Sequence, residues 1–148
     1  MKSQLKLMLA VALAACMPVV AAETATITGS VNVRSGPDRT LPTVTWLMRG
    51  ARVTVVGCVS NWRWCDVIAG RDRGWVYSRY LSVPFQGSAI VIADGGPNLG
   101  LPVIDFELGP YWDEHYQRRI FFSQKANWQT RWDQRRAQPE WREPAPRR

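Results

Sequence analysis

The stretch from Cys58 to Tyr80 constrains the fold of this chain most. It holds two of the three cysteines and three of the eight tryptophans of the 148-residue sequence. Arg52 to Val59 is the strongest β-forming run in the chain, and Trp62 to Ile68 follows it as a return strand. Two cysteines that face each other across such a hairpin have Cα atoms about 5.5 Å apart, which suits a disulfide. The stretch therefore predicts a hairpin closed by Cys58 and Cys65.

Short β-prone segments separated by turn signals continue on both sides of this hairpin. Thr24 to Arg34 is typical of one strand with a kink at Gly29-Ser30, and Ser35-Gly36-Pro37-Asp38 is a turn. Thr43 to Met48, Gly74 to Tyr77 and Ser82 to Pro84 are further strands, with a single helical turn at Ser78 to Leu81. Five or six short strands at this spacing indicate a mainly β fold, a small barrel.

Three blocks of the sequence resemble a known family. Residues Val31 to Pro37, Arg49 to Val55 and Gly74 to Leu81, in this order, resemble the bacterial SH3-like (SH3b) domain over about residues 25–84. The cysteine pair with Trp64-Cys65-Asp66-Val67, and Gly109-Pro110-Tyr111-Trp112-Asp113, are similar to the YraI-like subgroup of exported SH3-like proteins. The resemblance implies a small SH3-like barrel and non-catalytic binding, often to cell-wall peptidoglycan or its peptide cross-bridges.

The first 22 residues have the features of a secretory signal peptide. Lys2 and Lys6 precede an apolar run, Leu7 to Ala22, which ends in small residues and is short for a membrane span. An alternative is that Leu13-Ala14-Ala15-Cys16 is a lipobox, in which Cys16 becomes the lipidated N-terminus. Both alternatives predict an exported protein, either periplasmic, with or without a lipid anchor, or secreted.

Export also bears on the cysteines. Without Cys16, Cys58 and Cys65 are an even pair in an oxidising compartment, which favours a disulfide. Two cysteines and the lone His115 do not make a four-ligand zinc site. We therefore expect no metal and no cofactor.

The remaining chain divides into two parts after a barrel at residues 23–84. Residues 85–110 contain two apolar runs and are expected to pack on the barrel as an extension with short strands, including an extended segment from Leu101 to Leu108. In residues 111–148, Trp and Arg are frequent, and one or two helical pieces are predicted. Aromatic and apolar residues recur there at multiples of four: Trp112, Tyr116, Ile120, Trp128 and Trp132. Phe121-Phe122 breaks that register, and prolines predict a disordered end from Pro139 onward.

No catalytic set is apparent in the sequence. His115 is interpreted as a surface residue near a helix start, and Asp66 as a solvent-facing carboxylate on a strand. Neither cysteine has a basic partner in sequence. We therefore do not expect an enzyme.

The binding candidates are aromatic and arginine side chains of the barrel. Trp64 and Trp75 are assigned to the core, whereas Trp62, Tyr77 and Tyr80 are expected to line an exposed groove. The loop that starts at Arg34 would form one wall of this groove, and Arg79 would pair with a carboxylate of a peptide or glycan. The alternative is that these rings only pack against the extension.

The C-terminal part suggests a second kind of binding. Residues 118–148 hold nine basic and three acidic side chains, interleaved with tryptophans. Such a segment would suit an anionic membrane surface or an acidic protein of the envelope. A segment of this composition would also suit nucleic acid, because bases stack on tryptophan rings, but export argues against nucleic acid as the partner. The alternative is a solvated basic helix that docks by its aromatic face.

Overall fold

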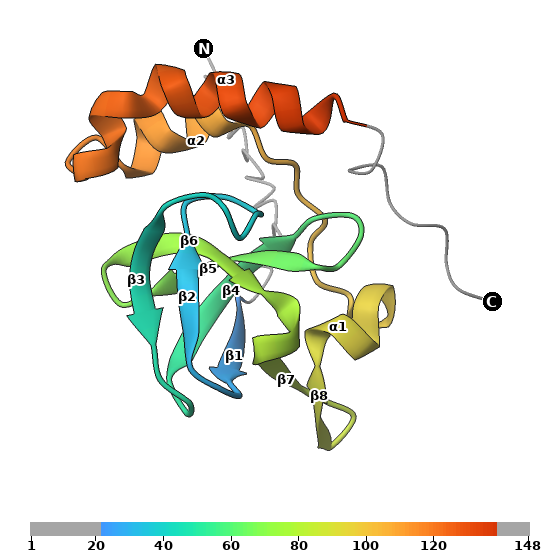
Figure 1. Cartoon of the computed structure of the whole chain (residues 1–148). Coiled ribbons are helices and arrows are strands. Elements are labelled where there is room, and N and C mark those ends of the chain that lie inside the picture. Colours follow the sequence, from blue (N-terminus) through green and yellow to red (C-terminus); the bar gives the residue numbers. More distant parts are fainter. Residues whose placement is uncertain (1–21, 139–148) are drawn as a thin grey trace, which may run out of the picture.

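The protein is an antiparallel β barrel with helices at one end (Figure 1). The computed structural model describes residues 22–138. Residues 1–21 of the expected signal peptide, which include Cys16, and the end of the chain from Pro139 lie outside the described residues. The strands are β1 (Glu23–Ile27), β2 (Val31–Arg34), β3 (Thr43–Leu47), β4 (Arg52–Cys58), β5 (Trp64–Ala69), β6 (Asp72–Tyr77), β7 (Leu81–Phe85) and β8 (Ser88–Val91). The helical elements are η1 (Ser78–Tyr80), α1 (Ile92–Gly95), η2 (Gly96–Leu99), α2 (Leu108–His115), η3 (Ile120–Gln124) and α3 (Lys125–Arg136). The expected mainly β fold with a partly helical extension is confirmed.

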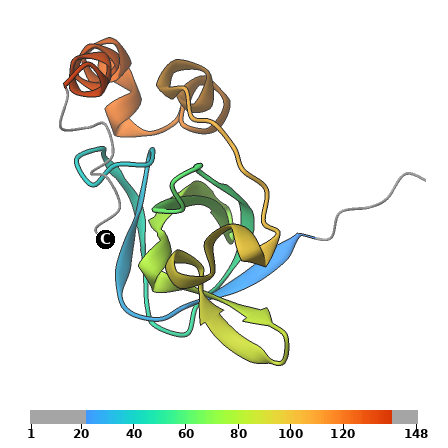
Figure 2. The same ribbon diagram turned by 90° about the vertical axis from the view of Figure 1, so that its right-hand side faces the viewer.

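The eight strands form one sheet in the order β3-β2-β6-β5-β4-β1-β7-β8. In Figure 2 the strands wrap around a common centre. The expectation of a single kinked strand from Thr24 to Arg34 is wrong. β1 pairs with β4 and β7, whereas β2 pairs with β3 and β6. Gly29-Ser30 therefore carries the chain from one part of the curved sheet to another.

The barrel core is built from alternating strand residues. Val53 and Val55 of β4 face inward together with Ala25, Ile27 and Val67, and all five are buried. Trp75 is fully buried, as the sequence predicted. Trp64, the first residue of β5, is only half-buried at the edge of the core, so its assignment to the core is wrong.

An extended segment, residues 101–107, runs alongside β4 toward the helices (Figure 1). We call it the strap. Its Pro102 carbonyl accepts a hydrogen bond from Cys58 N at 2.8 Å, and its Ile104 N donates to Cys58 O at 2.9 Å. A Cβ at Gly57 would lie 2.8 Å from the Ile104 side chain and 2.9 Å from the Pro102 carbonyl, so only glycine admits the strap this close. The sequence predicted an extended segment from Leu101 to Leu108. Within it, the structure has a single β-bridge, between Val103 and Cys58, rather than a strand.

The helices α2 and α3 lie side by side over one end of the barrel (Figures 1 and 2). The Trp112 indole of α2 is fully buried and donates from Nε1 to the Ser35 carbonyl at 2.8 Å. The Tyr116 hydroxyl donates to the Arg73 carbonyl at 2.8 Å. These bonds fix α2 to the loop after β2 and to β6.

The expected aromatic face of the C-terminal part needs one correction. Ile120 was placed on this face by its spacing, but it is 97% exposed. The helix α2 ends at His115 and the chain turns before η3, so the four-residue spacing no longer marks one face. Phe121 takes the inward position instead, with its ring 4.9 Å from that of Trp112.

Candidate ligand-binding groove

A groove of about 870 Å³ on the barrel combines aromatic and charged side chains. It lies where β2 and β6 separate, because these strands pair only at Arg34 and Trp75. Its aromatic lining is Trp46, Trp64, Tyr77 and Tyr80, and its charged lining is Arg34, Asp38, Arg39, Arg63 and Arg135. Ser30, Val31, Asn32 and Gln138 complete it.

Strand pairing and turns fix the aromatic side chains. Trp64 and Tyr77 are opposite each other on β5 and β6, with ring centroids 5.5 Å apart. Tyr80 belongs to η1 and lies over Gly29, where a Cβ would be 3.4 Å from the tyrosine ring. Trp46 of β3 is 54% exposed and Tyr80 is 38% exposed. Cross-strand pairing and backbone contact give these rings defined positions with free faces.

Trp46 was not among the residues that the sequence singled out. Val33 pairs with Thr45 and Arg34 with Thr43, so a register shift leaves Val44 without an opposite residue. Val44 is buried at this bulge. A strict two-residue alternation would therefore have turned Trp46 inward with Val44, and the bulge turns it outward. The only local signal for Trp46 is that it is the single aromatic residue of β3.

The arginines of the groove differ in how firmly they are held. Arg34 donates from Nη1 to Thr43 Oγ1 at 2.8 Å and to the Leu41 carbonyl at 3.3 Å. Arg39 and Arg63 are exposed, and neither has an ion-pair partner among the described residues. Arg135, the fourth arginine of the lining, is bonded to Asp38, so the groove has two fixed guanidinium groups and two that are available to a ligand.

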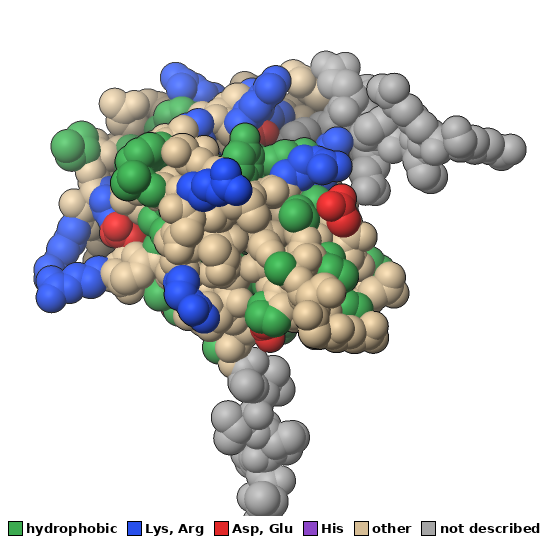
Figure 3. Space-filling view, turned by 90° about the horizontal axis from the view of Figure 1, so that it is seen from below, with side chains coloured by type: hydrophobic (Ala, Val, Ile, Leu, Met, Phe, Trp, Pro, Cys, Tyr) green, Lys and Arg blue, Asp and Glu red, His purple; other side chains and the backbone are tan. Residues whose placement is uncertain are grey.

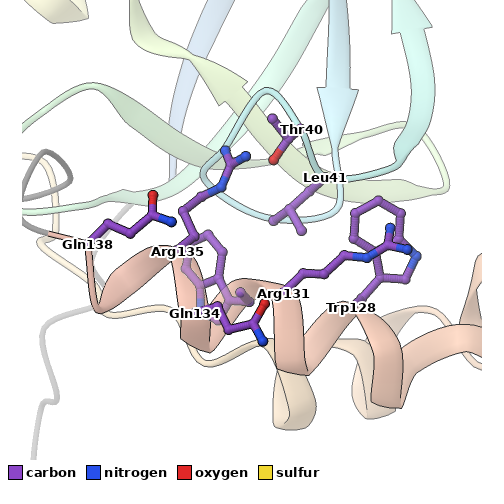
Figure 4. Close-up of a pocket in the computed structure, with 8 residues that line it drawn as sticks. Thr40, Leu41, Trp128, Arg131, Gln134, Arg135 and Gln138 are labelled. Atoms are coloured by element: carbon purple, nitrogen blue, oxygen red, sulfur yellow. The ribbon is translucent and has the colours of Figure 1, made fainter.

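The loop from Ser35 to Pro42 forms one wall and is held by α3. Asp38 is buried in this loop, and Arg135 Nη1 donates to its two carboxylate oxygens at 3.0 and 3.1 Å. The backbone N of Thr40 also donates to Asp38, at 2.6 Å. Figure 4 shows Arg135 extending from α3 toward the part of the loop that carries Thr40 and Leu41, beside a second, smaller cavity of about 380 Å³. The C-terminal helix thus shapes a site on the barrel.

Three of the five predicted binding residues meet in the groove: Arg34, Tyr77 and Tyr80. Trp62 does not line it. It has a positive φ of 61° at the hairpin tip and is half-buried, with its indole near Gly96 of η2. Arg79 points away as well and lies 3.9 Å from Asp94 of α1. For Trp62 the alternative of packing against the extension is therefore correct.

Asp66 is not the solvent-facing carboxylate that was expected. It is 1% exposed and accepts two hydrogen bonds from Arg73, at 2.9 and 2.8 Å, and one from the Tyr111 hydroxyl at 2.7 Å. Burial raises the pKa of Tyr111 far above its usual value, and the hydrogen bond to Asp66 raises the pKa of Arg73. This buried network joins β5, β6 and α2 and engages both carboxylate oxygens in hydrogen bonds.

His115 is mostly buried rather than at the surface. Its ring packs 4.6 Å from that of Tyr111, and burial lowers its pKa. It lies at the end of α2, outside the groove. The structure therefore assigns His115 to the packing of α2.

The tryptophans of α3 are engaged within the molecule. Trp132 is 6% exposed and meets Phe106 of the strap edge to face at 5.4 Å. Trp128 is half-buried beside Trp112, and Arg131 lies over its ring at 5.1 Å. The helix is thus docked by its aromatic face, with Arg131 and Arg136 exposed and Arg135 turned toward Asp38. None of the helices within residues 22–138 has the length and apolar character that a membrane crossing needs.

Basic side chains mark the surface more widely. On the face shown in Figure 3, Lys and Arg side chains lie among hydrophobic ones, and acidic side chains are sparse by comparison. The whole chain has a formal net charge of +7. Anionic ligands are therefore attracted to the protein in general.

Comparison with known protein families gives a match over the barrel. Residues 29–82 match the family model of the bacterial SH3 domain. The match begins just before β2 and ends in β7, so the strap and the helices α2 and α3 lie outside it. No curated protein and no solved structure gave a significant match to the chain.

Proposed function

Because residues 29–82 match the bacterial SH3 domain family, we propose that this protein is an exported, non-catalytic binding module for peptide or peptidoglycan-type cell-wall ligands. Domains of this family are commonly non-catalytic binding modules for cell-wall components. The single observation that carries the proposal for this chain is the groove between β2 and η1, with its four aromatic side chains. The similarity to the YraI-like subgroup stays a prediction, as do the signal peptide and the periplasmic location.

The groove favours binding by contact rather than by chemistry. Flat aromatic rings give large contact areas at a low entropic cost, because each has only two side-chain torsions to fix. Trp64 and Tyr77 are already fixed by pairing, and Tyr80 by its contact with Gly29. Ligand binding would therefore cost little free energy for fixing these side chains.

The proposal is tested by co-sedimentation of the mature protein with purified peptidoglycan sacculi. Replacement of Trp46 or Tyr80 by alanine should weaken binding about fivefold or more, as expected for an exposed aromatic side chain at the centre of a contact. Ile120→Ala is the matched control, because Ile120 is exposed and lies outside the groove. Absence of wild-type protein from the sacculus pellet would contradict the proposal.

A second candidate function is that of an envelope interaction protein whose basic C-terminal part binds anionic lipid or an acidic protein surface. It is supported by the outward arginines of α3, of which Arg131 and Arg136 are exposed. Since Trp132 is buried, this binding would depend on charge and should be strongly weakened by salt. Sedimentation with anionic vesicles tests it: R131Q together with R136Q should reduce binding, and unchanged binding would exclude α3 as the site.

A further inference from the structure

We propose that the groove selects an extended peptide that carries carboxylates, so that its ligand is an acidic peptide rather than a neutral one. This inference rests on the proposed function and names the class of ligand for the same groove. It is carried by two independent features of the lining: the balance of charges and the unpaired edge of β2.

The charge balance of the lining is strongly positive. Arg34, Arg39, Arg63 and Arg135 face a single acid, Asp38. Both oxygens of Asp38 are occupied by Arg135, and one of them also by Thr40. The pair Asp38–Arg135 is therefore internally neutral and buried at one end. The other three guanidinium groups remain as uncompensated charge along the groove.

The three guanidinium groups also have the right chemistry for carboxylates. Arginine binds a carboxylate through parallel hydrogen bonds, which makes the contact directional as well as electrostatic. Arg63 precedes Trp64 in sequence and lines a neighbouring cavity of about 590 Å³ as well as the groove. A carboxylate at Arg63 can thus be reached by a ligand whose backbone lies on the aromatic rings.

The strand edge indicates a peptide. β2 pairs with β3 at four positions but with β6 only through Arg34. Within the described residues, no strand covers the β6-facing edge from Val31 to Val33, and Val31 and Asn32 line the groove. An unpaired strand edge offers alternating N–H and C=O groups to an extended chain. A glycan has no backbone amides at this spacing and would leave the edge unpaired.

Aromatic rings line the groove along both β2 and β6. Tyr77 and Tyr80 come from β6 and η1, whereas Trp46 stands beside β2 on β3. A peptide on the edge of β2 would therefore have aromatic faces on both sides. Side chains alternate along an extended peptide, so acidic residues at every second position would all point toward the same wall.

The experiment compares two peptides that differ only in charge. The probes are acetylated and amidated Ala-Glu-Ala-Glu-Ala and the same peptide with Gln in place of Glu, titrated into the full mature protein at low salt with tryptophan fluorescence as the readout. We expect the acidic peptide to bind about tenfold more tightly, since each of two exposed ion pairs contributes about threefold. Arg63→Gln, which removes one of the two ion pairs, should reduce this preference to about threefold.

The control variant is Arg71→Gln. Arg71 is exposed in the turn between β5 and β6, at the opposite end of that hairpin from Trp64 and Tyr77, and should leave the preference unchanged. Equal binding of the two peptides, binding of neither, or an equal loss in both variants would overturn the inference. Tighter binding of polygalacturonate or of a single-stranded oligonucleotide than of the acidic peptide would overturn it too.

The outcome is independent of the test of the proposed function. Sacculus binding without a preference for the acidic peptide would leave the proposed function standing and remove this inference. A preference for the acidic peptide without sacculus binding would retain the acidic-peptide site and exclude peptidoglycan as its source.

Discussion

Asp66 shows how a single side chain can join separate parts of this molecule. It is buried on β5, and its partners come from β6 and from α2. Each partner is a donor, so the carboxylate is fully satisfied although it is out of water. Removing its charge would leave the Arg73 guanidinium next to an uncharged amide in a largely closed site.

Asp66→Asn should therefore lower the free energy of unfolding by about 3 kcal/mol, the cost of breaking a buried ion pair by removing one partner. Urea denaturation of the purified protein measures it. Asp113→Asn is the matched control: Asp113 pairs with Lys125 at the surface, and its loss should change stability by less than about 1 kcal/mol. Equal effects of the two substitutions would contradict the assignment of Asp66 as a buried junction.

Tyr111 makes stability depend on alkaline pH. Its pKa is raised in the folded state, mainly by burial, whereas in the unfolded chain it titrates near its usual value of about 10. Above that pH the unfolded state releases a proton that the folded state retains, so the free energy of unfolding falls as pH rises. Tyr116 contributes in the same direction, because burial raises its pKa as well.

Tyr111→Phe should accordingly be less stable than wild type near neutral pH, because the hydrogen bond to Asp66 is lost, but should lose less stability above pH about 10. Urea midpoints measured on both sides of that pH test this. An alkaline slope identical to that of the wild type would show that Tyr111 is not the group responsible.

At the scale of elements, the barrel was largely predictable. Turn signals such as Asp38 and Asn61 and valine-rich runs such as Val53 to Val56 are local, so they place most strands within a few residues. The pairing of Cys58 with Cys65 follows from the same hairpin, and the disulfide is present.

The groove was predictable only in part, because it depends on contacts that are distant in sequence. Trp46 is turned outward by a bulge that no single strand encodes. The Trp62 indole packs near η2, which follows it in the sequence by more than thirty residues. The inward environment of Asp66 is completed by Tyr111. In each case the deciding partner belongs to another element, so periodicity within one segment could not reveal it.

Arg135 is the residue of α3 that both lines the groove and binds the loop from Ser35 to Pro42. Arg135→Gln should release the loop from Ser35 to Pro42, because Asp38 would lose both of its contacts to α3. Amide hydrogen exchange of Thr40 and Leu41 should then be faster, since their N–H groups donate to Asp38. Arg131→Gln, one turn earlier, is the control, because among the described residues Arg131 has no ion pair to Asp38. Unchanged exchange at Thr40 would show that the loop is rigid without α3.

For the molecule as a whole, the family match covers less than the folding unit. Trp75 of the barrel packs against Phe106 of the strap and Tyr111 of α2, with ring centroids 5.4 and 6.0 Å apart. The strap also satisfies the backbone of Cys58. The barrel therefore needs the C-terminal part to cover its core.

A chain that ends at Pro84 should consequently be unstable, although it contains every residue of the family match. Burial of one large aromatic side chain contributes about 3 kcal/mol, and such a chain would expose Trp75 and remove the hydrogen bond from Tyr111 to Asp66. Near-UV circular dichroism and limited proteolysis should show loss of fixed packing relative to residues 23–138. A cooperative, protease-resistant fold of the shorter chain would contradict this view.

The strap also decides when the disulfide can form. Cys58 and Cys65 have no exposed surface, and the backbone of Cys58 is bonded to Pro102 and Ile104 from the C-terminal side. Thiol–disulfide exchange requires in-line access of a thiolate to sulfur, which the finished structure does not offer. We therefore expect oxidation to come first and docking of the strap second, after which the buried disulfide is protected from reduction.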